Sequence, residues 1–192
     1  MITMTQAACQ KIVEIMESKG QQGCALRLRI VGRGVDEFKY DMRFVEPDSI
    51  TPNDTALDMG LFKLVIDASS ASHLAGTIID FRTMANGGGG LLIDNPNPVW
   101  TDATARAVAL IIEKHINPGV QAHGGYVNLI DVKDGVVTIT MNGGCQGCGM
   151  AAMTLRYGIE QMIREAVPSI SEVVDVTEHA LGTNPFFPKK GT

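Results

Sequence analysis

Cys145 and Cys148 are separated by two residues within a glycine-rich segment, residues 143–149. This spacing allows both sulfur atoms to reach one metal ion or cluster. The surrounding glycines allow the backbone to approach a bulky inorganic group and to adopt positive φ angles. Thiolates bind zinc, Cu(I) and iron–sulfur clusters, whereas Mg²⁺ and Ca²⁺ prefer oxygen ligands. The segment therefore predicts a soft-metal site or a redox-active dithiol.

Two of three interpretations of the pair involve no metal. Buried structural cysteines are disfavoured because a glycine-rich segment makes a poor core. A thiol–disulfide motif at the start of a helix fits the spacing. However, no aromatic residue directly precedes Cys145 and no proline lies between the cysteines. A hairpin also precedes the pair, where a thioredoxin-like fold would place a βαβ unit.

The third interpretation is a metal site, which requires more sulfur than one chain offers here. Iron–sulfur clusters and structural zinc sites normally use four cysteines. The other two cysteines, Cys9 and Cys24, lie in the first half of the chain, and we expect both to be small apolar residues. The simpler completion is a second copy of the chain across a two-fold axis. A cluster held in this way is exposed and has few contacts, which suits transfer.

Other residue patterns give weaker signals. His123 precedes two glycines, and a turn at the entry to a hairpin explains its position better than metal ligation does. Residues 87–90 are all glycine but lack the Lys-Ser/Thr of a phosphate-binding loop. The sequence has no paired-carboxylate signature, so general acid–base catalysis has no clear location. A cluster carrier, which is not an enzyme, needs no such residues, and a dithiol oxidoreductase is the alternative.

Composition narrows the classes further. The chain has 192 residues, of which 45% are hydrophobic and 19% are charged, and its formal net charge is −5. These values are typical of a globular protein and argue against a nucleic-acid binder held by phosphate contacts. No apolar run approaches the roughly 18 residues of a membrane span. Four cysteines without a secretory signal predict a cytoplasmic protein.

Hydrophobic periodicity predicts an α+β fold of two small domains, residues 1–97 and 98–192, joined by the proline-containing segment 95–98. In the first domain, Thr3 is expected to cap a helix that ends near Gly20. The expected strands are residues 25–31, 38–44, 61–67, 77–81 and 91–93, with a short helix or turn at 70–74 and tight turns at 32–34 and 87–90.

In the second domain, a helix is expected from Thr101 or Asp102 to the Asn-Pro-Gly sequence at 117–119. A hairpin of residues 126–132 and 136–141 follows, with Asp-Gly in its turn. A helix over residues 150–167 and a strand over 173–176 complete the domain. The inward side chains of the last helix are expected to be Leu155, Ile159, Met162 and Ile163. The cysteine pair thus lies between a strand and a helix.

The second half of the chain resembles the Nfu (NifU C-terminal) domain of iron–sulfur carriers over about residues 98–187. The resemblance implies that Cys145 and Cys148 of two subunits hold one [4Fe–4S] cluster per homodimer. It further implies that an upstream scaffold donates this cluster and that apo iron–sulfur proteins accept it. The matching residues are 116–118, 123–125, 143–148, Leu155, Gly158, Ile159 and 176–179.

The first half resembles the A-type (IscA-like) carrier fold in residues 32–40, 65–67 and 74–81. A-type carriers use one cysteine in the first loop and a Cys-x-Cys near the end. This chain has Val35 at the first position and no cysteine in residues 93–96. The resemblance therefore implies a degenerate A-type domain without cluster ligands, which would recognise targets or donors.

Overall fold

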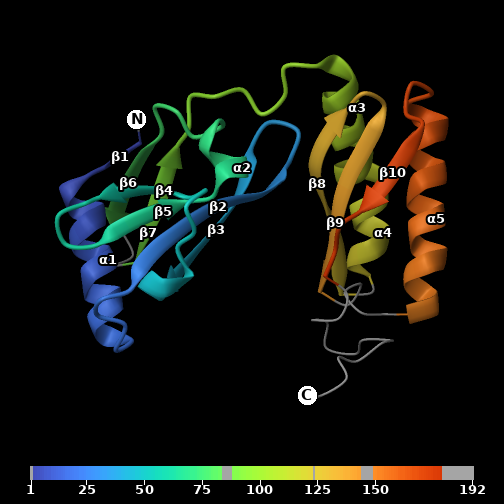
Figure 1. The fold of residues 1–192 in the computed structure, drawn as a ribbon. Coiled ribbons are helices and arrows are strands. Elements are labelled where there is room, and N and C mark those ends of the chain that lie inside the picture. The colour runs from blue at the N-terminus through green and yellow to red at the C-terminus, as the bar shows by residue number, and fades with distance from the viewer. Residues whose placement is uncertain (1, 84–87, 123, 144–148, 179–192) are drawn as a thin grey trace. The chain divides into compact units, whose positions relative to one another are not determined.

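The computed structural model describes residues 2–83, 88–122, 124–143 and 149–178, and residues 149–154 by their backbone alone. Its chain forms two compact units (Figure 1). One contains residues 1–30 and 40–98, and the other residues 31–39 and 99–192. Helices and strands occur in both units, so the predicted mixed α+β class is confirmed.

Two sheets and one long helix build the first unit. The helix is α1 (Gln6–Ser18). One sheet has the order β1-β6-β7 and the other β3-β2-β5-β4. The strands are β1 (Thr3–Met4), β2 (Ala25–Arg33), β3 (Phe38–Val45), β4 (Thr55–Asp58), β5 (Lys63–Ile66), β6 (Ile78–Thr83) and β7 (Gly89–Asp94). The end of β2 and the start of β3 extend into residues 31–39, which belong to the second unit. Two short helical turns, η1 (Pro47–Ser49) and α2 (Ala68–Ala71), complete the unit.

Apolar side chains from α1 and both sheets form one core. Ala8, Ile12 and Met16 recur on one face of α1 and are buried, as the helical spacing of the sequence predicts. They belong to the same buried cluster as strand residues that include Leu28 and Leu64, neither of which is exposed. Burial of this shared apolar area is the main force that holds the helix against the sheets.

The predicted cap of α1 is wrong by two residues. Thr5 is the N-cap, and its hydroxyl accepts a hydrogen bond from the Ala8 N–H at 3.2 Å and donates one to Asp80 at 2.7 Å. Thr3 lies instead in β1, which pairs with Ile78 of β6. Because the strand takes Thr3, the helix cannot begin there, and Thr5 ties the start of α1 to β6.

Two further differences concern strand edges. β4 was not predicted, because three of its four residues are exposed and it has no apolar alternation; its pairing with β5 defines it. Gly89 and Gly90 were expected in a turn but lie in β7 opposite Thr83 and Arg82 of β6. The other end of that expected turn, Gly87, lies outside the described residues.

Arg27 and Asp54 form a nearly buried ion pair in the first unit. The Arg27 guanidinium donates to both Asp54 carboxylate oxygens, at 3.1 and 3.0 Å. Asp54 also accepts from the Thr51 N–H at 2.8 Å. The hydrogen bonds from Arg27, followed by the bond from Thr51, hold the pKa of Asp54 below its usual value. The pair fastens residues 51–54 to β2.

This pair predicts an acid dependence of stability. A lowered carboxyl pKa in the folded state stabilises the fold at pH values above the unfolded pKa of about 3.9. That stabilisation is lost as the pH falls through the folded pKa. We expect wild type to exceed Asp54→Asn in free energy of unfolding at neutral pH, with the gap closing in acid. Urea denaturation at several pH values measures this, and the exposed neighbour Asp48→Asn should show no such gap.

The predicted linker, residues 95–98, begins on the surface of the first unit. Asn95 Nδ2 donates to the Tyr40 hydroxyl at 3.0 Å and to the His73 carbonyl at 2.9 Å. Asn97 Nδ2 donates to the Ala75 carbonyl at 2.8 Å. These side-chain bonds fix the first three residues of the segment, so it is less free than its prolines alone would make it.

The second unit is a three-stranded sheet with helices packed on one face. The sheet has the order β10-β9-β8, in which β10 is parallel and β8 antiparallel to β9. The elements are α3 (Ala103–Ile111), η2 (Ile112–Ile116), α4 (Asn117–Gln121), β8 (Gly125–Lys133), β9 (Val136–Gly143), α5 (Gly149–Ala166) and β10 (Glu172–Asp175).

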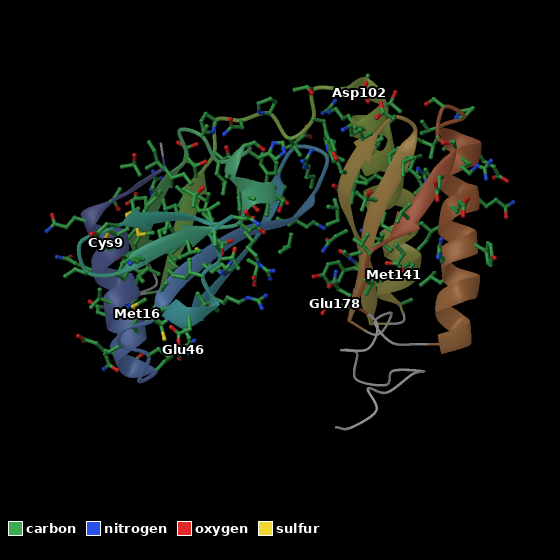
Figure 2. The ribbon with its side chains drawn as sticks, in the orientation of Figure 1. Cys9, Met16, Glu46, Asp102, Met141 and Glu178 are labelled. Carbon is green, nitrogen blue, oxygen red and sulfur yellow. The ribbon has the colours of Figure 1, made fainter. Side chains whose placement is uncertain are left out.

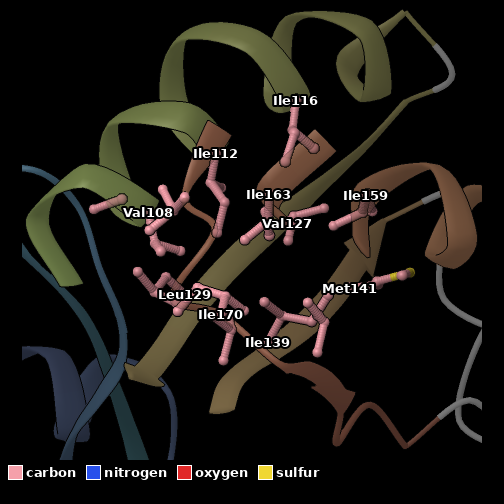
Figure 3. Close-up of a cluster of buried hydrophobic side chains, with 14 of the residues drawn as sticks. Val108, Ile112, Ile116, Val127, Leu129, Ile139, Met141, Ile159, Ile163 and Ile170 are labelled. Atoms are coloured by element: carbon pink, nitrogen blue, oxygen red, sulfur yellow. The ribbon is translucent and has the colours of Figure 1, made fainter. Parts of the chain in front are cut away.

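Alternate residues of the strands point into the core of the second unit, as a half-covered sheet requires. Ile139 is not exposed at all, and Leu129 is 1% exposed. Figure 3 shows these side chains next to Ile112 and Ile116 from η2 and Ile163 from α5. The predicted inward position of Met162 is wrong, because this side chain is 40% exposed.

The first helix of this unit begins where the sequence predicts but does not end there. Asp102 caps α3 by accepting a hydrogen bond from the Ala105 N–H at 2.8 Å. The chain then continues as a π-helical stretch, η2, and as α4 through the expected stop at 117–119. Pro118 is tolerated because it lies in the first turn of α4, where its missing N–H removes no hydrogen bond within the helix.

Candidate metal centre

The predicted ligands Cys145 and Cys148 lie outside the described residues, as does His123. The structure does describe the two elements that flank the cysteine pair. β9 ends at Gly143, two residues before Cys145, and α5 begins at Gly149, directly after Cys148. These bounds confirm the predicted strand and helix on either side of the pair. Unpaired N–H groups at the start of a helix favour thiolate over thiol.

A tight hairpin positions the strand that leads to the cysteines. Asp134 and Gly135 connect β8 and β9 with φ angles of 51° and 78°, the left-handed values that a two-residue hairpin turn requires. Regular pairing, interrupted by one bulge between Leu129 and Asp131, continues to Gly125, which lies opposite Gly143. The hairpin thus fixes which residues meet where β9 ends.

Thr177, two residues after the end of β10, holds the same end of β9 from its other edge. The Thr177 hydroxyl accepts a hydrogen bond from the Met141 N–H at 2.6 Å and donates one to Asp175. The Thr177 N–H also donates to Asp175, at 2.9 Å. Met141 is fully buried and lies two residues before the end of β9, at the lower end of the strand in Figure 2. Thr177 therefore replaces the strand partner that Met141 would otherwise lack.

Removal of this hydroxyl should destabilise the second unit. Thr177→Val keeps the shape of the side chain but leaves the Met141 N–H without its acceptor. A buried donor that loses its partner costs about 1–3 kcal/mol. Urea denaturation of the metal-free chain should show a loss of this size. Thr140→Val is the control, because Thr140 is half-buried and lies on β9 next to Met141. It should lower the free energy of unfolding less than Thr177→Val does. An equal loss in both variants would contradict the role of Thr177.

The two cysteines of the first unit have no metal-binding surroundings. Cys9, labelled on α1 in Figure 2, packs against the buried cluster of that unit. Burial raises the pKa of its thiol. Cys24 is partly exposed, and its sulfur donates to the Glu46 carboxylate at 3.6 Å. Burial, followed by the charge of Glu46 and this hydrogen bond, raises the pKa of Cys24. A raised thiol pKa disfavours the thiolate form that a metal would bind.

No second metal site competes in the part of the chain that the structure describes. There, no group of three or more His, Cys, Asp or Glu side chains could hold a metal ion.

None of the described helices is both long and apolar enough to cross a bilayer.

Sequence reasoning gave no role to two residues that hold the strands leading to the cysteine pair, although both lie in segments that resemble the Nfu domain. Thr177 is one, and the buried Asn117, which binds the backbone of β8, is the other. Asn117 has a local signal, since an asparagine before a proline often marks a turn, but the sequence does not reveal its partner ten residues away. The resemblance over residues 176–179 includes Thr177 but does not reveal its contact with Met141, because the two residues lie 36 positions apart.

Two family models match the chain. A model described as iron-sulphur cluster biosynthesis matches residues 1–104, and one described as NifU-like domain matches residues 108–174. Together they define the class: a protein in which an iron-sulphur cluster biosynthesis domain precedes a NifU-like domain. Cys145 and Cys148 fall within the NifU-like match.

Curated relatives match this chain over nearly their whole length. The Fe/S biogenesis protein NfuA of Xanthomonas euvesicatoria pv. vesicatoria (strain 85-10) is 33% identical, covering 98% of both chains. That of Ectopseudomonas mendocina (strain ymp) is also 33% identical, covering 97% of this chain and 98% of the relative. The chain belongs to this NfuA family of Fe/S biogenesis proteins, and the resemblance predicted from the sequence is confirmed.

Two solved structures resemble part of the chain. One is IscA with its [2Fe-2S] cluster, with a TM-score of 0.43 and 25% identity over 54% of this chain and 92% of that one. The other is Escherichia coli SufA, with a TM-score of 0.40 and 23% identity over 50% of this chain and 85% of that one.

Proposed function

We propose that this chain is a carrier of [4Fe–4S] clusters. Two copies would hold one cluster between them through Cys145 and Cys148 of each copy. The carrier would receive the cluster from an upstream scaffold and deliver it to apo iron–sulfur proteins. The observation that carries the proposal is the location of the cysteine pair. It lies between the end of β9 and the start of α5, inside the NifU-like match.

The ligand count requires the second copy. A [4Fe–4S] cluster takes four cysteine thiolates, and one chain supplies two at this site. The raised thiol pKa values of Cys9 and Cys24 and the core packing of Cys9 make these residues poor substitutes. Four thiolates around a [4Fe–4S]²⁺ core give a net charge of −2, and the N–H groups at the start of α5 favour such negative charge.

The cluster is cargo in this proposal, not a resident cofactor. A cluster at the interface of two chains has few protein contacts, and separation of the copies exposes all its ligands together. An acceptor whose own thiolates replace those of the carrier can then take it by ligand exchange. No step needs a general acid or base, so the protein acts as a carrier and not as an enzyme.

We assign residues 98–192 to cluster binding and residues 1–97 to recognition of donors or acceptors, and we place the protein in the cytoplasm. The first domain lacks cysteine where A-type carriers have it, at Val35 and in residues 93–96. In residues 95–97 the asparagine side chains bond to Tyr40 and to the backbone of residues 73–75. These polar groups stabilise the fold without binding metal.

Transfer to an acceptor tests the proposal. The chain is loaded anaerobically with iron and sulfide, freed of both by desalting, and mixed with an apo-enzyme that requires a [4Fe–4S] cluster. We expect acceptor activity to appear faster than with the same amount of free iron and sulfide, even with a chelator present. If the loaded chain keeps its metal and the acceptor stays inactive, the metal is structural. If the metal-free chain instead reduces disulfides, it is a dithiol oxidoreductase.

A further inference from the structure

Gly125 and Gly143 lie opposite each other where β9 ends. Their close backbone contact is the crossing of β8 and β9. Gly143, the last residue of β9, has a φ angle of +65° and lies opposite Gly125 of β8. A Cβ atom added to Gly143 would lie 2.4 Å from the Gly124 carbonyl oxygen and 3.2 Å from the Gly125 Cα. No side chain fits at that distance from a backbone atom. Backbone therefore packs directly on backbone two residues before Cys145.

Asn117 holds the β8 side of this crossing. Its side chain is 7% exposed, accepts a hydrogen bond from the Val127 N–H at 2.7 Å and donates one to the Val127 carbonyl at 3.0 Å. One side-chain amide thus satisfies both backbone polar groups of the buried residue Val127, as a neighbouring strand would. Because Val127 lies two residues after Gly125, the start of α4 sets the position of the crossing.

Gly124 completes the arrangement. It has a φ angle of +72°, yet a Cβ atom added there would meet nothing within 4 Å. Its need for glycine is therefore conformational, whereas Gly143 needs glycine for both its φ angle and its close contact. Substitution by alanine should therefore disturb the structure less at Gly124 than at Gly143.

We propose that Asn117 and Gly143 are positioning residues for the cluster thiolates, an inference that rests on the proposed function. Asn117 fixes β8 to α4, and the close contact at Gly143 fixes the end of β9 to β8, two residues before Cys145 in the sequence. Thr177 holds Met141 on the opposite edge of β9. Together these contacts fix where β9 ends, and we expect a fixed strand end to lengthen the time for which the cluster is retained.

The test compares cluster lifetimes among five variants of the full chain. Gly124→Ala changes a glycine of positive φ without a close contact. Gly143→Ala and Asn117→Ala disturb the crossing. Gly158→Ala makes the same glycine change in α5, where the added Cβ atom has open space. Val173→Ala removes buried apolar atoms from β10 and lowers stability away from the crossing. Each protein is loaded anaerobically and mixed with a ferrous chelator, and the decay of the visible absorption and of the visible circular dichroism is followed.

We expect Gly143→Ala and Asn117→Ala to lose the cluster about 10–100-fold faster than wild type, as changes behind metal ligands typically do. Gly158→Ala and Val173→Ala should match wild type, and Gly124→Ala should lie between. If Val173→Ala loses its cluster equally fast, lifetime follows global stability and the inference is wrong. Unchanged lifetimes in Gly143→Ala and Asn117→Ala would also overturn it. Should Gly143→Ala not fold, Asn117→Ala decides, because it changes no glycine. A wild-type chain that takes up no cluster refutes the proposed function itself.

Discussion

Cys145→Ser and Cys148→Ser are each expected to abolish cluster binding, and to do so equally. Both subunits of the dimer carry the substitution, so each variant lacks two of the four thiolates. The two remaining sulfur ligands cannot hold a cubane that takes four cysteines. Both variants should remain colourless after anaerobic loading with iron and sulfide, and both should lack the cluster-bridged dimer in size exclusion.

The matched controls are Cys9→Ser and Cys24→Ser. Cys9 packs against the core of the first unit, and Cys24 donates a hydrogen bond to Glu46, so neither replacement touches the cluster. Both controls should load iron and sulfide as the wild type does. Unequal effects of the two site variants would favour a dithiol mechanism, in which one thiol attacks and the other resolves.

Ile139→Ala is expected to have the largest effect on stability. Ile139 is fully buried in the middle of β9, among side chains from η2 and α5. Its replacement removes three carbon atoms from a closely packed core and leaves a cavity. Buried Ile-to-Ala changes cost about 2–5 kcal/mol. Urea denaturation of the metal-free chain measures the loss through the shift in midpoint.

Thr138→Ala is the control for Ile139→Ala. Thr138 is the preceding residue of the same strand, is half-buried, and points to the opposite face of the sheet. Its replacement should cost less than about 1 kcal/mol, the range of strand propensities. Equal losses in the two variants would mean that the face covered by helices is not the main core of this unit.

The elements that flank the cysteine pair were predictable because their signals are local. The Asp134-Gly135 turn, with alternating runs on both sides, specifies its hairpin within a few residues, and the structure shows the expected positive φ angles. Asp102 caps α3 through an N–H group only three residues away. Local chemistry of this kind does not depend on the rest of the fold.

The misplaced elements depend on distant partners. Thr3 and Thr5 are both chemically able to cap α1, and only the pairing of Thr3 with β6 decides between them. β4 has no pattern of its own and exists because β5 pairs with it. In the same way, Pro118 ends a helix in many contexts, but here a buried Asn117 holds the next helical turn in place.

The candidate site also has one part that the local sequence indicates and another that depends on distant contacts. The type and spacing of Cys145 and Cys148 indicate thiolate chemistry from the sequence alone, and family membership selects iron–sulfur biogenesis from the possible uses. The contacts that hold β8 and β9, from Asn117 to Val127 and from Thr177 to Met141, join segments that only the folded chain brings together.

Whether this chain carries a [4Fe–4S] cluster between two copies is decided by metal and sulfide analysis of the anaerobically loaded wild-type chain, together with its mass in solution. We expect a brown dimer with about two iron and two sulfide per chain and a broad absorption band at about 400 nm, as for a cubane on four cysteines. A colourless dimer with about half a zinc ion per chain would indicate a structural Cys₄ site instead. That result, or a metal-free monomer, would show that the chain is not a cluster carrier.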